Sequence, residues 1–154
     1  MSVELLNKET VVKYLTDKKV ISTSDNAEVE VLTGGVSNVV LAITTANQKL
    51  VLKQALAELA VSEKWLADQR RAIVEADAIK LFNQLSPDQV PKLIFLDPER
   101  FILVLERVPV GSTVWKSDLL AGVINPDVGA GLGKTLATWH NYGEVTASAK
   151  IKFM

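Results

Sequence analysis

A lysine stands in the middle of a short apolar run, Leu50-Val-Leu-Lys-Gln-Ala55. A polar turn at 45–48 precedes this run, which predicts a strand. Alternate residues of a strand share a face, so Lys53 should point to the same side as Val51 and Ala55. An ammonium group among small apolar residues either extends to the edge of the sheet or binds something anionic.

A carboxylate is equally out of place in the helix predicted at 70–85, whose apolar side carries Ile79 and Phe82. Glu75 falls at the centre of that side, because those two residues are its i+4 and i+7 neighbours. A charge on a buried side is costly alone and tolerable as half of an ion pair. We therefore predict a Lys53–Glu75 ion pair between strand and helix, and a purely structural salt bridge remains the alternative to a ligand-binding one.

Composition limits the classes of function. A length of 154 residues indicates a single domain. The net charge of −1 gives no electrostatic basis for binding nucleic acid or an anionic membrane. The absence of cysteine excludes disulfides and thiolate chemistry, and a single histidine argues against a histidine-built metal site. No signal peptide and no apolar run of ~20 residues is visible, so we expect a soluble, cytoplasmic protein.

Periodicity predicts the secondary structure of most of the chain. In the first strand Glu28 and Glu30 should face outward, and Val29 and Val31 inward. The segment 57–65 fits either a helix or an irregular linker. We expect strands at 25–32, 38–44, 49–55, 92–96 and 101–105, and helices at 7–16, 70–85, 115–120 and 126–140.

The turn Thr33-Gly-Gly-Val-Ser-Asn38 joins the first two of these strands. Glycines in a hairpin usually serve the backbone geometry of the turn. The alternative is a flap whose N–H groups and Ser37 hydroxyl approach phosphates, since only residues without side chains let a backbone come so close. The order strand, glycine turn, strand, lysine strand, glutamate helix matches the protein-kinase set, in which the lysine holds phosphates and the glutamate positions the lysine.

These motifs resemble the N-lobe of aminoglycoside phosphotransferase-like kinases, a family that includes relatives acting on choline and methylthioribose. The resemblance rests on Leu32–Val40, Leu50–Gln54, Glu75 and Phe101–Glu106. It covers nearly the whole chain from Glu28 onward. It implies an α+β fold with a five-stranded antiparallel sheet and a packed αC-type helix. The implied domains are an N-lobe at 1–107, a hinge at 108–113 and an incomplete C-lobe at 114–154.

The resemblance also implies a nucleotide site, with ATP as cofactor and Mg²⁺ only in a full-length protein. The phosphate flap would be formed by Gly34, Gly35, Ser37 and Asn38, because the family loop commonly reads Gly-Gly-x-Ser-Asn. Lys53 and Glu75 would be the ion pair of the family. Backbone atoms of Glu106 and Val108 would bind the adenine edge.

One departure from the family matters for activity. The His-x-Asp loop, its following Asn and the metal-binding Asp of the family are absent from the sequence. His140 is followed by Asn141 and not by x-Asp, and we interpret it as a helix-terminal residue with a structural hydrogen bond. Without a base or a metal ligand, this chain should not catalyse phosphoryl transfer, and we assign it no catalytic residue.

Two hypotheses for the function follow. The chain is either the N-terminal part of an ATP-dependent phosphotransferase for a small-molecule hydroxyl, with the acceptor undecided, or a nucleotide-binding or dimerising interaction module without catalysis. An incomplete C-lobe would leave Leu119, Leu120 and the inner side of 132–139 uncovered, so we expect a homodimer through these helices.

A segment that looks like a P-loop, Gly129–Thr135, fails the spacing test. The motif needs a glycine five residues before Gly133, and Val128 stands there. A helix start precedes the segment where a P-loop needs a buried strand. We expect its small residues to permit close helix packing instead.

Overall fold

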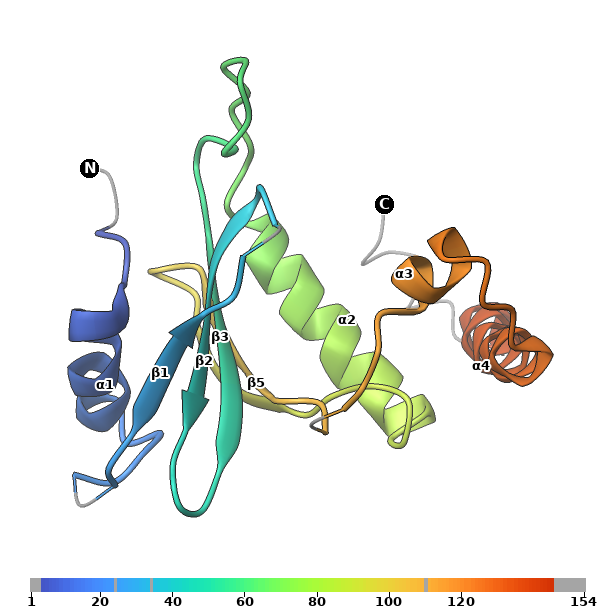
Figure 1. Ribbon diagram of the computed structural model, residues 1–154, viewed down its shortest axis with the longest axis horizontal. Coiled ribbons are helices and arrows are strands. Elements are labelled where there is room, and N and C mark those ends of the chain that lie inside the picture. Colours follow the sequence, from blue (N-terminus) through green and yellow to red (C-terminus); the bar gives the residue numbers. More distant parts are fainter. Residues whose placement is uncertain (1–3, 24, 34, 110, 146–154) are drawn as a thin grey trace. The chain divides into compact units, whose positions relative to one another are not determined.

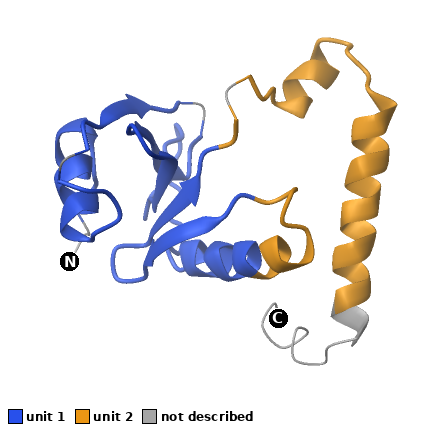
Figure 2. Ribbon diagram, turned by 90° about the horizontal axis from the view of Figure 1, so that it is seen from below, with its two compact units in different colours: residues 1–80, 91–107 blue, residues 81–90, 108–154 orange. Residues whose placement is uncertain are grey.

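The computed structural model describes residues 4–23, 25–33, 35–109 and 111–145. Contacts divide the chain into a first unit, residues 1–80 and 91–107, and a second unit, residues 81–90 and 108–154 (Figure 2). The elements in chain order are α1 (Lys8–Asp17), β1 (Glu28–Val31), β2 (Asn38–Thr44), β3 (Lys49–Ala55), α2 (Arg71–Leu85), β4 (Leu93–Asp97), β5 (Ile102–Glu106), α3 (Trp115–Leu120) and α4 (Pro126–Val145) (Figure 1).

The first unit is built on one antiparallel sheet with the strand order β1-β2-β3-β5-β4. The hairpin of β2 and β3 pairs Val40 with Lys53, and β5 pairs Leu103 with Lys53 on the other side, so the lysine lies on the central strand. The predicted α+β class and five-stranded antiparallel sheet are confirmed.

The alternation of β3 separates two cores, one on each face of the sheet. Leu50 and Leu52 join the larger cluster, which includes Val11 and Leu15 of α1. Ala55 points to the other face and joins a cluster with residues of α2. Figure 1 shows α1 and α2 on opposite sides of the strands. Lys53, two residues before Ala55, shares the α2 face, as predicted from the period of a strand.

A buried glutamine ties the start of the chain to the sheet. The side chain of Gln54 is fully buried, accepts a hydrogen bond of 2.8 Å from the N–H of Leu6, and donates one of 3.1 Å to the carbonyl of Glu4. Asn7 then begins α1 by accepting from the N–H groups of Glu9 and Thr10 in a capping box. The N-terminal segment is therefore held before the helix starts.

A buried carboxylate fixes the turn between β4 and β5. Asp97 accepts hydrogen bonds from the Tyr14 hydroxyl (2.8 Å), the Lys18 ammonium (2.9 Å) and the backbone N–H groups of Glu99 and Arg100 (both 3.1 Å). Burial alone would raise the pKa of Asp97, but the hydrogen bonds from Lys18 and Tyr14 outweigh it and lower that pKa. Burial and the Asp97 contact raise the pKa of Tyr14.

Several predicted boundaries shift by a residue or two, and the first strand by more. It is only four residues long, and Val31, predicted to face inward, is 45% exposed because β1 lies at the edge of the sheet. The segment 57–65 is irregular rather than helical and carries an isolated bridge between Glu58 and Leu66.

The second unit joins α3 and α4 to the last turns of α2. The ring of Trp139 stacks on Phe82 with 4.0 Å between centroids, and its indole N–H donates to the Ser86 hydroxyl at 3.1 Å. The helix α4 continues to Val145, so the prediction that His140 ends it was wrong: no proline follows His140, and Gly143 costs too little to stop a helix.

The glycines of the rejected P-loop lie inside α4, and the element directly before α4 is the helix α3 instead of a strand. Among the described residues, no atom outside the helix lies within 4 Å of the Cβ position at Gly129, Gly131 or Gly133. The expectation that these glycines permit close helix packing was therefore wrong, because nothing in the described chain approaches them.

Candidate functional site

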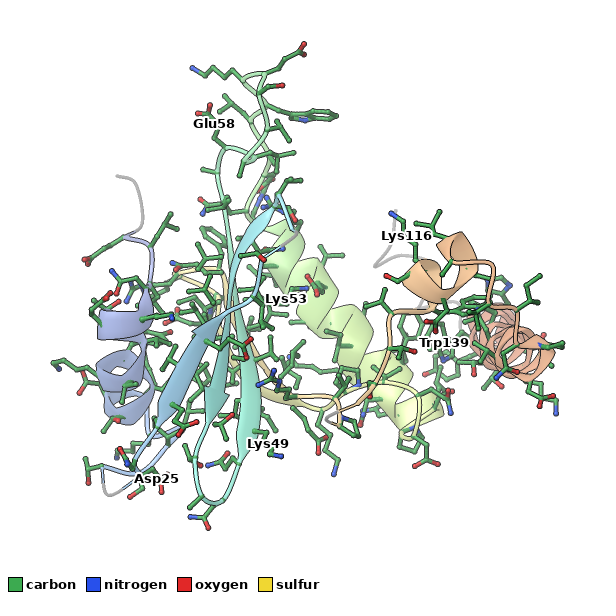
Figure 3. The ribbon with its side chains drawn as sticks, in the orientation of Figure 1. Asp25, Lys49, Lys53, Glu58, Lys116 and Trp139 are labelled. Atoms are coloured by element: carbon green, nitrogen blue, oxygen red, sulfur yellow. The ribbon has the colours of Figure 1, made fainter. Side chains whose placement is uncertain are left out.

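The predicted ion pair is present in the structure. The ammonium of Lys53 on β3 contacts a carboxylate oxygen of Glu75 on α2, and Figure 3 shows Lys53 on the side of the sheet that faces this helix. The side chains are 24% and 36% exposed. The pair is thus half-buried rather than fully buried, and solvent or a ligand can reach it.

Small residues of α2 explain why the pair forms at this border. Ala72 and Ala76 are buried and pack against Ala55 and Leu103 of the sheet. Alanine has a short side chain, so the helix can approach closely, and Glu75, next to Ala76 in the sequence, is carried to the rim of this contact. The packing of three alanines therefore sets the position of the carboxylate.

The glycine turn lies at the end of the strands beyond Lys53. Gly34 lies outside the described residues, and Gly35 is exposed, with no atom within 4 Å of its Cβ position. In the described part of the chain, the N–H groups of Gly35, Val36 and Ser37 have no hydrogen-bond acceptor. Positive φ angles of described glycines occur at Gly111 and Gly122, so turn geometry does not explain Gly35.

The second half of this turn is held firmly. The carbonyl of Val36 accepts from the N–H of Ala60 at 2.8 Å, and the carbonyl of Ser37 accepts from the N–H of Leu56 at 3.0 Å. The Asn38 side-chain amide donates to the Ser37 hydroxyl at 3.0 Å. Unbonded N–H groups therefore lie next to anchored carbonyls, which is an arrangement that suits an anion.

Arg71 is a residue of this region that the sequence reasoning missed. Its guanidinium donates to the carbonyl of Ser37 at 2.6 Å and to the carbonyl of Leu56 at 2.8 Å. One signal was available: Arg71 begins α2, where a cation is unfavourable with the helix dipole. An arginine at such a position needs a compensating interaction, and here the contact with the glycine turn provides it.

The two predicted adenine-binding positions stay predictions. Glu106 is the last residue of β5, is exposed, and donates its backbone N–H to the carbonyl of Lys92 at 2.9 Å. Val108 is exposed and belongs to the second unit.

Two features are absent from the described residues. No group of three or more His, Cys, Asp or Glu side chains there could hold a metal ion. No described helix is long and apolar enough to cross a membrane. The described residues therefore offer Mg²⁺ no such cluster of ligands.

Sequence comparison finds methylthioribose kinases among the relatives of this chain. A methylthioribose kinase of Bacillus cereus is 29% identical over 133 residues, which cover 86% of this chain and 34% of the relative. A methylthioribose kinase of Enterobacter sp. is 31% identical over 117 residues, covering 74% of this chain and 29% of the relative. The chain is a distant homologue of the methylthioribose kinases. No protein-family model matches it.

The fold agrees with this relationship. A five-stranded antiparallel sheet with α2 packed across one face, and a lysine and a glutamate paired between them, is consistent with a kinase-like N-lobe. The chain spans about a third of the length of the Bacillus cereus methylthioribose kinase that it matches.

Proposed function

We propose that this chain is the N-terminal part of an ATP-dependent small-molecule kinase and contains its nucleotide-binding N-lobe. The single observation that carries the proposal is the Lys53–Glu75 ion pair, which is half-exposed and lies near the end of β3 where the glycine turn leads into β2. The relatives are named for methylthioribose, so a hydroxyl of a methylthioribose-like sugar is the acceptor we propose for the whole protein. Residues 1–107 form the N-lobe in this proposal, 108–113 the hinge and 114–154 the start of a C-lobe.

Each residue of the site has a role in this proposal. Lys53 binds phosphate oxygens through its ammonium group, and Glu75 keeps that group in place. Gly34, Gly35, Ser37 and Asn38 cover the phosphates, and the backbone of Glu106 and Val108 binds the adenine edge. ATP supplies the phosphoryl group. We propose that the chain alone binds nucleotide without turnover, because its sequence holds no His-x-Asp loop to orient an acceptor hydroxyl.

A titration followed by amide NMR tests the proposal. ATP should shift the amide signals of Gly35, Ser37 and Lys53, and adenosine should leave the signals of the glycine turn in place because it has no phosphates. The absence of any shift at millimolar ATP would overturn the proposal for this chain.

A second candidate function, a dimerising interaction module, has its own support. In the second unit, Val128, Leu132 and Leu136 lie one helical turn apart on α4 and are each about 40% exposed. A cavity of about 490 Å³ opens beside them. Trp115 lines this cavity, and its buried indole N–H has no partner among the described residues. We propose that a second copy of the chain covers this surface.

A further inference from the structure

The guanidinium of Arg71 joins three segments of backbone. It donates to the carbonyls of Ser37 at 2.6 Å, Leu56 at 2.8 Å and Asp68 at 2.9 Å. Ser37 ends the glycine turn, Leu56 follows β3, and Asp68 precedes α2. All of these residues lie in the first unit, so the contacts belong to one compact body.

Arginine suits this task because its planar guanidinium presents five N–H donors in a rigid fork. A lysine ammonium in the same place is a compact group that cannot reach several carbonyls with fixed geometry. The neighbouring Arg70 provides a contrast, since it forms its side-chain contacts with the carboxylate of Asp68 in an exposed pair, 76% and 59% accessible. Of these two adjacent arginines, Arg71 is the one bonded to the turn.

Arg71 and Glu75 are four residues apart and therefore lie on the same side of α2. Glu75 contacts Lys53, and Arg71 contacts the carbonyl of Ser37. One side of one helix thus holds both the lysine and the end of the glycine turn. These two groups would have to act together on a polyphosphate.

We propose that Arg71 is a positioning residue that couples the glycine turn to the Lys53–Glu75 pair. The turn and the pair are then held in a fixed relative position and contact the phosphates of a nucleotide together. This inference rests on the proposed nucleotide site. In this arrangement Arg71 acts on the phosphates through the turn, because three of its five N–H donors hold backbone carbonyls. Its loss should weaken the binding of phosphates and leave the binding of the nucleoside unchanged.

The test compares Arg71→Met with Arg71→Lys and with the matched control Arg70→Met, each titrated with ATP and with adenosine. Arg71→Met should weaken ATP about tenfold, the size of one lost charged hydrogen bond, and change adenosine less than about twofold. Arg71→Lys should recover part of the ATP affinity, and Arg70→Met should match the wild type. Equal weakening of ATP and adenosine by Arg71→Met, or no weakening of ATP, would overturn the inference.

Amide hydrogen exchange without nucleotide separates this inference from the proposed function. The N–H groups of Leu56 and Ala60 donate to the carbonyls of Ser37 and Val36, so their exchange reports on the anchored turn. Arg71→Met should accelerate both, and Arg70→Met should not. If the wild type binds neither ATP nor adenosine, the proposed function fails. If the amide exchange of Leu56 and Ala60 is also unchanged in Arg71→Met, the inference that Arg71 holds the turn fails as well. Arg71→Lys keeps the comparison usable if Arg71→Met does not fold.

Discussion

Lys53 and Glu75 form an ion pair between the central strand and α2, although they lie 22 residues apart in the sequence. Both side chains are partly exposed, and pairs of this kind contribute only about 0–1 kcal/mol. The buried alanines of α2 hold the helix on the sheet instead. The pair is therefore dispensable for stability, which leaves it available for binding an anion.

Lys53→Met should change the free energy of unfolding by less than about 1 kcal/mol in urea denaturation and abolish the ATP-induced amide shifts. Lys49→Met is the matched control, since Lys49 is an exposed lysine on the same strand and the same face. It should leave both stability and ATP binding unchanged. A loss of several kcal/mol in Lys53→Met alone would make the pair structural and contradict this prediction.

Gln54→Leu should destabilise the protein by about 1–3 kcal/mol, because the buried N–H of Leu6 loses its acceptor. Urea denaturation measures the loss. Gln84→Leu, at an exposed position of α2, is the control and should change stability by less than about 0.5 kcal/mol. If the two variants are equally stable, the N-terminal segment is not held by Gln54.

Asp97 should make stability depend on pH on the acid side. Its pKa is lower in the folded chain than in the unfolded chain, so its stabilising effect is fully present above the unfolded value of about 3.9. That effect is lost as the pH falls through the lower, folded-state pKa. Asp97→Asn should therefore be less stable than the wild type at neutral pH, and the difference should shrink in acid.

Free energies of unfolding between pH 2 and pH 7, a range around that carboxyl pKa, measure this difference. The control is Asp17→Asn, whose carboxylate forms an exposed pair with Lys13. It should show almost no difference from the wild type at any pH. A gap between Asp97→Asn and the wild type that stays constant from neutral pH into acid would contradict the assignment.

Self-association should depend on the apolar stripe of α4. Leu132→Glu places a charge in the centre of the stripe and should convert a dimer to a monomer in size-exclusion chromatography with light scattering. Ala130→Glu adds the same charge on the opposite side of α4, about 160° around the helix axis, and should leave the dimer intact. A wild type that remains monomeric at high concentration would remove the basis of this prediction.

Much of the sheet could be predicted because its strands are short apolar runs bounded by turn residues, or alternate between polar and apolar residues as β1 does. The limits of β2, β3 and α3 match the predicted ranges. The Lys53–Glu75 contact was predictable for a different reason. Each charged residue occupies a position where the pattern of its own strand or helix predicts an apolar residue. Burying either charge alone is unfavourable, and pairing the two charges reduces that penalty. The sequence marked Arg71 only as a cation at the start of α2. Its contacts could not be predicted, because its three partners are backbone carbonyls that any residue provides.

The sequence by itself determined most of the element types, the side of its strand on which Lys53 lies and the partner of Lys53, because hydrophobic periodicity and unpaired charge can be recognised in single segments. Only the tertiary structure decided how the glycine turn is anchored, what buries Gln54 and where the Asp97 cluster forms. These contacts join residues up to 83 positions apart, and such distances depend on how the strands and helices pack. Packing of that kind is a property of the whole first unit and of no single segment.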